Sequence, residues 1–254
     1  MTITFLGTGT SQGVPVIACG CEVCTSADPR DNRLRSSILV EGEGKVIVID
    51  SGPDFRQQML REKVQHLDAI VFTHEHKDHI AGMDDIRAFN YKQNAPINVY
   101  ADTRVQNALK REYPYIFDEL IRYPGIPEIT IHTIDDAPFT VGNIGFTPIE
   151  VMHYKLPVKG FRIHDFTYIT DAKTIADAEK EKIKGSKTLV INALQKQKHI
   201  SHFTLDEAIA FAEEIGAEKT YFTHISHRLG RHEVISKDLP LNIELAYDGL
   251  RISI

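Results

Sequence analysis

The sequence predicts an α/β protein in which two β-sheets pack face to face with helices on the outside. Short apolar strands occur in two groups along the 254 residues, and helix-forming segments follow in each group. Histidine and aspartate residues follow several of these strands. Such strands and helices bury their apolar faces by forming layers. No linker, internal repeat or low-complexity tract divides the chain, so we expect one domain over residues 1–254.

The composition limits the classes of function. Hydrophobic residues make up 42% and charged residues 25%, which is typical of globular proteins. The net charge of −6 gives no support for non-specific nucleic-acid binding. The first residues lack the basic segment of a signal peptide, and no apolar run approaches the ~18 residues of a membrane span. We therefore expect a cytoplasmic protein that does not act at a membrane.

The first half of the chain alternates strands and helices. Residues 3–6 predict a strand, and a Gly-rich loop follows it. Residues 37–40 and 45–49 flank Glu41-Gly42-Glu43-Gly44, which predicts a hairpin. The next predicted elements are a helix at 54–62, a strand at 69–72, a helix at 83–89, a strand at 97–100 and a helix at 102–111 that Asp102 caps.

The second half is richer in strands. Residues 113–127 contain three prolines and resist assignment. Beyond them we predict strands at 129–131, 139–141, 144–150, 160–163, 166–169, 189–192 and 220–222, and helices at 174–182 and 205–215. The last apolar runs, at 243–246 and 250–254, predict a hairpin around Asp248-Gly249.

One short segment concentrates metal-binding side chains. His74, His76, Asp78 and His79 directly follow the apolar strand at 69–72. The first two histidines are two residues apart, so their side chains leave an extended segment on the same side. The aspartate and the third histidine come where the chain should turn, and could serve a second ion. Imidazole with carboxylate suits Zn²⁺, Mn²⁺ or Fe²⁺.

Three more candidate ligands follow predicted strands far along the chain. His153, Asp171 and His224 each occur where an apolar strand ends. A single residue of this kind is usually a cap or a solvated turn residue. Together with the first cluster, the three predict a metal site on one rim of the sheet sandwich.

These residues resemble five ordered motifs of the metallo-β-lactamase superfamily. Asp50 after a strand resembles the first motif, in which the aspartate supports the metal loop, and the 74–79 segment resembles the second. His153, Asp171 and His224 resemble the third, fourth and fifth. The resemblance implies a four-layer αββα sandwich of two mixed sheets. It also implies that His74, His76 and His153 hold one ion, that Asp78, His79 and His224 hold the other, and that Asp171 bridges the two ions.

All cysteines of the chain lie in one loop. They are Cys19, Cys21 and Cys24, and a disulfide between the first two is geometrically poor and leaves one thiol over. Free thiols are the simplest alternative. A Cys₃His zinc site needs a fourth ligand, for which His227 is the candidate.

The cysteine loop is also similar to one branch of the superfamily. PhnP-type phosphodiesterases combine such a loop with a histidine three residues after the fifth-motif histidine, and bind a structural zinc there. The strings 223–227, 247–249 and 153–156 of this chain resemble the same branch. Pyrroloquinoline quinone biosynthesis B-type proteins share a similar loop, so the loop alone does not determine the substrate.

The branch resemblance implies a hydrolase with two divalent ions, Zn or Mn, that attacks a phosphodiester with a bridging hydroxide. The substrate would be a small cyclic or nucleotide-like ester, such as 5-phosphoribosyl 1,2-cyclic phosphate. His202 is the candidate proton donor to the leaving group, with His199 as the competing assignment, and Asp78 belongs to the catalytic set. Arg35 and Lys155 are candidate phosphate contacts, although solvated surface cations are the more frequent case.

Three alternatives remain at this point. A tRNase Z-type nuclease would carry a long basic arm, which this acidic chain does not show. A thioester or lactam hydrolase would have no use for His202. A non-catalytic metal-binding relative of the quinone-biosynthesis proteins would not need complete ligand sets. Relatives also suggest a homodimer, which the sequence itself does not reveal.

Overall fold

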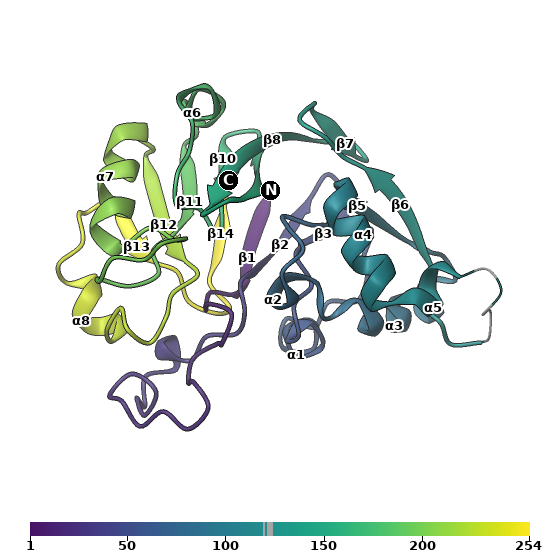
Figure 1. The fold of residues 1–254 in the computed structure, drawn as a ribbon, viewed down its shortest axis with the longest axis horizontal. Coiled ribbons are helices and arrows are strands. Elements are labelled where there is room, and N and C mark those ends of the chain that lie inside the picture. Colours follow the sequence, from purple (N-terminus) through teal and green to yellow (C-terminus); the bar gives the residue numbers. More distant parts are fainter. Residues whose placement is uncertain (119, 121–123) are drawn as a thin grey trace.

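The protein is a sandwich of two mixed β-sheets with helices on both outer faces. A computed structural model describes residues 1–118, 120 and 124–254. In Figure 1 the helices α1 to α5 cover the sheet on the right, and α7 and α8 cover the sheet on the left. This arrangement confirms the predicted four-layer αββα fold class.

Within the described residues each sheet has seven strands. The first sheet has the order β14 (Arg251–Ser253), β1 (Thr2–Gly7), β2 (Ser37–Gly42), β3 (Lys45–Ile49), β4 (Ala69–Val71), β5 (Ile97–Ala101) and β6 (Ile129–Thr133). The second has the order β13 (Ile243–Leu245), β12 (Lys219–Thr223), β11 (Thr188–Asn192), β10 (Phe166–Tyr168), β9 (Leu156–Ile163), β8 (Ile144–His153) and β7 (Phe139–Val141). The predicted hairpin of β2 and β3 is confirmed by their antiparallel pairing.

The helices follow the strands that they cover. They are α1 (Phe55–Arg61), α2 (Lys77–Ile80), α3 (Arg87–Gln93), α4 (Thr103–Glu112), α5 (Pro114–Phe117), α6 (Asp177–Ile183), α7 (Leu205–Ile215) and α8 (His232–Ser236), with 3₁₀ turns at Pro29–Asp31 and Met83–Ile86. Asp102 caps α4 as predicted, since its side chain accepts from the Val105 amide. Thr204 begins α7 with a capping box.

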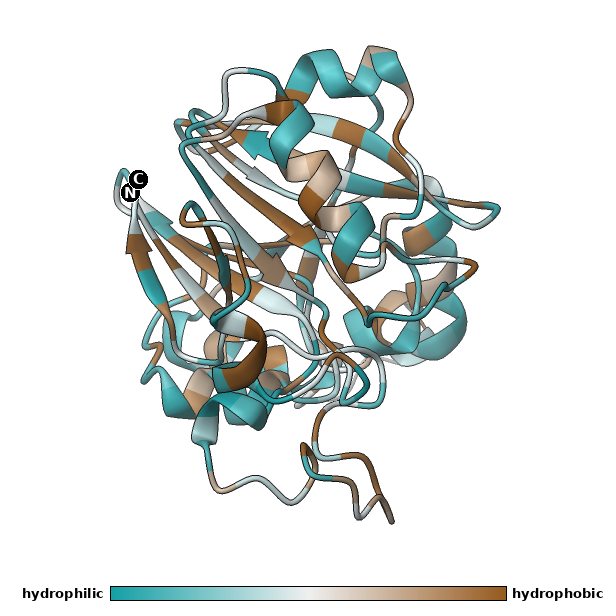
Figure 2. Ribbon diagram, turned by 90° about the vertical axis from the view of Figure 1, so that its left-hand side faces the viewer, coloured by the Kyte–Doolittle hydropathy of each residue, from teal (hydrophilic) through white to brown (hydrophobic). Residues whose placement is uncertain are grey.

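Strand periodicity explains how the layers hold together. In β3, Ile47 and Ile49 face the core between the sheets, whereas Val48 faces the helices of the first sheet. In β11, Val190 faces the core between the sheets and Ile191 faces α7. Successive side chains leave a strand on opposite faces, so strands covered on both sides are apolar throughout. Figure 2 shows brown segments along the strands of both sheets and many teal segments on the helices outside them.

The predicted hairpin at the end of the chain is wrong. β13 pairs in parallel with β12 in the second sheet, whereas β14 pairs antiparallel with β1 in the first. The turn between them is held by Asp248, which accepts hydrogen bonds from Thr8 and from the Leu34 amide at 2.8 Å. These contacts direct the chain from one sheet to the other, and sequence pattern alone does not encode such a crossing.

The segment 113–127, left unassigned by the sequence, begins with α5. Residues 119 and 121–123 of that segment lie outside the described residues. Among the helices that the structure describes, none combines the length and apolar character needed to cross a membrane.

A buried arginine joins the loop after β1 to the far end of the second sheet. Arg33 is 3% exposed and donates to Thr8 Oγ1 at 2.8 Å and to the Ala246 carbonyl at 2.6 Å. Its other terminal nitrogen lies 3.1 Å from Nδ1 of His232, which must accept this hydrogen bond. Burial and the guanidinium of Arg33 lower the pKa of His232 to about 4.

This contact predicts a loss of stability in acid. The folded-state pKa of His232 lies below its ordinary value of 6.5, so the unfolded chain binds the extra proton as the pH falls from 6.5 to about 4. Over that range the wild type should lose about 3 kcal/mol of unfolding free energy that His232→Gln keeps. Urea unfolding at several pH values measures the difference. Exposed His164→Gln is the control, and parallel curves for wild type and His232→Gln would contradict the assignment.

Candidate metal centre

The candidate ligands lie at one rim of the sandwich because they follow the ends of strands. His74 comes after β4, Asp171 after β10 and His224 after β12, while His153 is the last residue of β8. His76 precedes α2, and Asp78 and His79 lie within it. The carboxyl ends of neighbouring parallel strands meet at one edge, which brings these side chains together.

Asp171 is the centre of the cluster. Its Oδ1 lies 3.0 Å from Nδ1 of His224 and 3.5 Å from Nε2 of His79. Its Oδ2 lies 3.6 Å from Nε2 of His74. Two groups therefore share this carboxylate: Asp78, His79 and His224 on one side, and His74 and His76 on the other, each set with its ligand atoms within 4.8 Å of one another.

His153 stands at the second side of the cluster. Its ring centroid is 5.2 Å from that of His76, and its Nδ1 lies 2.9 Å from the Ser201 carbonyl. That hydrogen bond leaves Nε2 free as a ligand atom, because Nδ1 carries the proton. All seven predicted ligands thus come together.

The donor atoms fit divalent metal ions. Nε2 of His74 and Nε2 of His79 are buried and have no hydrogen-bond partner. A buried polar atom without a hydrogen-bond partner lowers stability by about 1–3 kcal/mol. A cation bound between these two nitrogens and the carboxylate would remove that cost. Burial opposes a charge on His79, yet Asp78, Asp50 and Asp171 hold its pKa well above the usual value. The same three carboxylates would attract a divalent cation.

Asp50 lies behind this cluster, in the position that the family resemblance implies for a supporting residue. Its side chain is fully buried and lies 2.7 Å from Nδ1 of His79. It also accepts from the amide and the hydroxyl of Thr73, at 2.9 and 2.8 Å. These bonds orient the imidazole and the start of the 74–79 segment, a role typical of residues behind a metal ligand.

The backbone is strained at three of these strand ends. Asp50, Asp171 and His224 have φ angles of 66°, 57° and 54°. Non-glycine residues rarely adopt the left-handed region, and when they do they gather at functional sites. The strain turns each side chain toward the rim at the point where its strand ends.

His202 lies beside the cluster and His199 lies farther out. The ring centroid of His202 is 4.5 Å from that of His153 and 4.8 Å from that of His224. Its side chain is 7% exposed and its Nδ1 has no partner. His199 is instead bonded to the amide and hydroxyl of Ser201 through Nδ1. Of the two candidates, His202 is the one placed against the ligands.

The two predicted phosphate contacts differ in their surroundings. Arg35 is already paired with Asp54 at 3.1 Å and also donates to the Ser11 carbonyl. Lys155 lines a groove beside His76 and His153. Arg104 lines the same groove, and sequence reasoning missed it because a lone arginine in a helix gives no signal of its own.

The cysteine loop meets its predicted partner. The sulfur atoms of Cys19, Cys21 and Cys24 lie 3.3, 3.4 and 3.5 Å from Nδ1 of His227. The four ligand atoms lie within 4.8 Å of one another, which matches a closed Cys₃His set. The loop projects from the body at the lower left of Figure 1. His227 connects this loop to the segment that carries His224.

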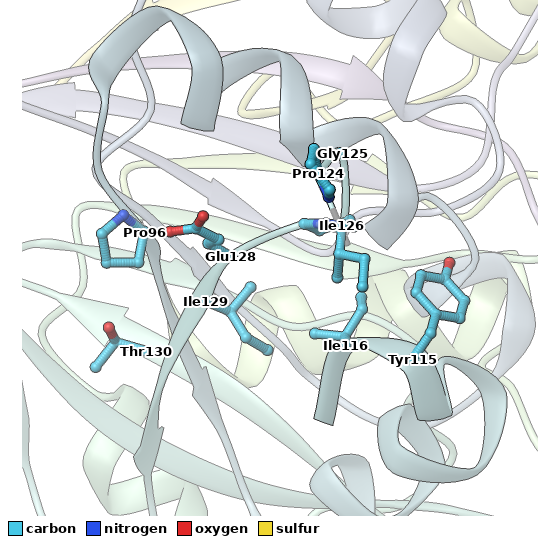
Figure 3. A pocket seen from close by; sticks show the side chains of 10 residues that line it. Pro96, Tyr115, Ile116, Pro124, Gly125, Ile126, Glu128, Ile129 and Thr130 are labelled. Atoms are coloured by element: carbon cyan, nitrogen blue, oxygen red, sulfur yellow. The ribbon is translucent and has the colours of Figure 1, made fainter. Parts of the chain in front are cut away.

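A separate cavity lies beside α5, away from the metal cluster. Figure 3 shows Tyr115, Ile116 and Glu128 among the side chains that line it. Its described lining residues include one carboxylate and no imidazole. The cavity therefore lacks the donor set of a metal-dependent site.

Comparison with known proteins places the chain in a family. The profile described as Beta-lactamase superfamily domain matches residues 45–225. A crystal structure of a new diphosphatase from the PhnP family is 40% identical, with a TM-score of 0.93 over 100% of this chain and 97% of that one. Zn(2+)-bound PqqB from Methylobacterium extorquens shares the fold, with a TM-score of 0.80, 18% identity and full coverage of both chains.

A curated relative is longer than this chain. The Porphyromonas gingivalis protein named Octanoyltransferase is 39% identical over 253 residues, which cover 98% of this chain. The match covers 51% of that protein, so this chain spans about half its length. Taken with the profile match and the diphosphatase, the likeness shows that the chain belongs to the metallo-β-lactamase superfamily.

Proposed function

We propose that the protein is a metal-dependent phosphodiesterase acting on a small cyclic or nucleotide-like ester. The observation that carries this proposal is the gathering of imidazoles on both sides of Asp171. Similarity to a PhnP-family diphosphatase supports chemistry at phosphorus. A phosphoribosyl 1,2-cyclic phosphate-like compound is the leading candidate substrate by resemblance.

The donor set suits two ions, Zn or Mn, since both accept nitrogen and oxygen ligands. His74, His76 and His153 would hold one, Asp78, His79 and His224 would hold the other, and Asp171 would bridge. When bound, such ions lower the pKa of a coordinated water toward ~7 and polarise the phosphoryl oxygens. The chain itself orients the ligands: Asp50 fixes His79, and the Ser201 carbonyl fixes His153.

The leaving group needs a proton when the P–O ester bond breaks. An alkoxide leaves poorly at neutral pH without a proton donor, and His202 stands beside the ligands at the rim. Burial, with His224 nearby, lowers the pKa of His202 to about 2 in the free protein. An anionic phosphate beside the ring favours the protonated form, so we assign the acid role to the substrate complex.

We assign a structural zinc to Cys19, Cys21, Cys24 and His227. A closed set of this kind leaves no position for substrate, so its effect on catalysis must pass through His224, three residues before His227. His227→Ala should lower Tm by about 5 °C or more and kcat/KM by about 10–100-fold. Zinc content, Tm and kcat/KM measure this, with exposed His164→Ala as the control. Unchanged zinc content and Tm would contradict the assignment.

Metal analysis with a substrate panel tests the proposed function. We expect about three metal ions per chain and turnover of bis-p-nitrophenyl phosphate and of five-membered cyclic phosphates. An octanoyl thioester belongs in the panel because of the name of the P. gingivalis relative. Thioester turnover without diester turnover would overturn the proposal. Fully loaded protein that is inert on every ester would favour a non-catalytic metal-binding protein.

A tRNase Z-type activity is a further alternative. Against it stands the net charge of −6, which disfavours binding to a polyanion. Incubation with a tRNA precursor under the same metal conditions gives the direct test.

A further inference from the structure

A groove opens on the side of the metal cluster formed by His76 and His153. Three separate segments supply its other walls: the first turn of α4, the turn between β8 and β9, and the loop before α7. The lining residues are His76, Arg104, His153, Tyr154, Lys155, Leu156, Ile200 and Ser201. A molecule whose phosphate lies at the cluster would extend into this groove.

Two large apolar side chains of the groove are unusually exposed. Tyr154 is 52% exposed and Ile200 is 65% exposed. Isolated exposed apolar residues are common on protein surfaces and need no explanation. Here both line one groove that also contains two candidate metal ligands, and they come from different loops. This placement gives an otherwise polar site an apolar patch within reach of its substrate.

The backbone at Tyr154 argues that this side chain is needed. Tyr154 and Lys155 form the two-residue turn between His153 and Leu156, which pair across the hairpin. The φ angle of Tyr154 is 59°, in the left-handed region where glycine is the favoured residue of such turns. A bulky aromatic residue there is an outlier. Folding alone would be served as well or better by glycine.

The groove also carries positive charge. Nζ of Lys155 lies 5.3 Å from the ring centroid of Tyr154. Arg104 is 48% exposed at its side chain and pairs with Glu75 at 3.3 Å. Cations beside exposed apolar groups suit a ligand that combines an anionic group with a flat apolar one. A nucleotide has this combination.

We propose that the groove binds the base of a mononucleotide phosphodiester, with Tyr154 and Ile200 against the base and with Arg104 and Lys155 toward its phosphate. The inference rests on the proposed function, because it presumes that the scissile phosphate lies at the His and Asp cluster. The net charge of −6 favours a single nucleotide over a nucleic-acid chain, because a chain carries many phosphates and the protein as a whole is acidic.

Two esters with the same reactive ring test the proposal. Adenosine 2′,3′-cyclic phosphate and glycerol 1,2-cyclic phosphate are both five-membered cyclic diesters, and only the first has a base. Stacking on an aromatic side chain should raise kcat/KM for the adenosine ester about 10–100-fold over the glycerol ester, mainly through KM. Ring opening is followed by phosphorus NMR, which needs no chromogenic group.

Variants of the turn separate binding from folding. Tyr154→Gly should remove most of the preference for the adenosine ester while Tm stays the same or rises, because glycine suits the positive φ. Ile200→Ala should reduce the preference by a smaller factor. Tyr154→Phe keeps the ring and should keep the preference. Tyr91→Ala removes another exposed tyrosine, on α3, and serves as the remote control.

A binding measurement without turnover distinguishes the two proposals. Titration calorimetry should give a Kd for adenosine 3′-monophosphate about 10–100-fold lower than for glycerol phosphate, and Tyr154→Gly should abolish the difference. Equal Kd values, or a preference unchanged in Tyr154→Gly, would overturn the groove assignment even if both esters are hydrolysed. Binding through Tyr154 without hydrolysis of any ester would support the groove and refute the phosphodiesterase.

Discussion

Asp171→Asn should lower kcat/KM on a phosphodiester by at least ~10⁴-fold, because it removes the carboxylate shared by both halves of the cluster. The substitution keeps the shape of the side chain and removes its charge. Neutralisation weakens both proposed ion sites together, and Lewis-acid stabilisation worth several kcal/mol would be lost with the ions. Metal content should fall from about three ions per chain toward about one, the ion at the cysteine site.

The control is Asp177→Asn on α6, where the carboxylate is 98% exposed. It should keep both activity and metal content. Metal analysis and steady-state kinetics are needed together, with Tm as a check of folding. If Asp171→Asn retains its ions and its kcat/KM, the carboxylate does not bridge the proposed ions.

His202→Ala should lower the rate by ~10²–10⁴-fold on an ester with an alkoxide leaving group, and much less on a p-nitrophenyl ester. A p-nitrophenolate leaves without help from an acid, whereas an alkoxide does not. Metal content should stay at the wild-type value. The last measurement matters because His202 also lies within ligand distance of His153 and Asp171.

His199→Ala is the matched control for His202→Ala, since the two rings lie 5.2 Å apart and compete for the same role. His199→Ala should change the rates on the alkoxide ester and on the p-nitrophenyl ester only slightly, and by the same factor. Equal losses on both esters in His202→Ala would reject the acid role. A loss of metal in that variant would make His202 a ligand instead.

The candidate site was largely predictable because its ligands follow strands in recognisable strings. His74 to His79 form one such string, and Asp171 and His224 each come where an apolar run ends. The end of a strand at a sheet rim is a position that local sequence encodes. The pairing of His227 with the cysteine loop followed in the same way from residue type and spacing.

Other features depend on contacts that local sequence does not encode. Arg104 reaches the groove only because α4 packs beside the 74–79 segment, where it pairs with Glu75. The separation of β13 from β14 depends on Asp248 holding the loop after β1. The positive φ of Tyr154 also appears only in three dimensions, because nothing in its neighbours marks a turn that would prefer glycine.

The pairing of β14 with β1 bears on how the protein matures during synthesis. Thr2 lies opposite Ser253, so the first sheet cannot be completed until the last of these 254 residues has left the ribosome. Contacts between residues so distant in sequence form slowly. His224 and His227 also leave the ribosome long after the residues that they join, so neither proposed metal site can form until most of these 254 residues have been made.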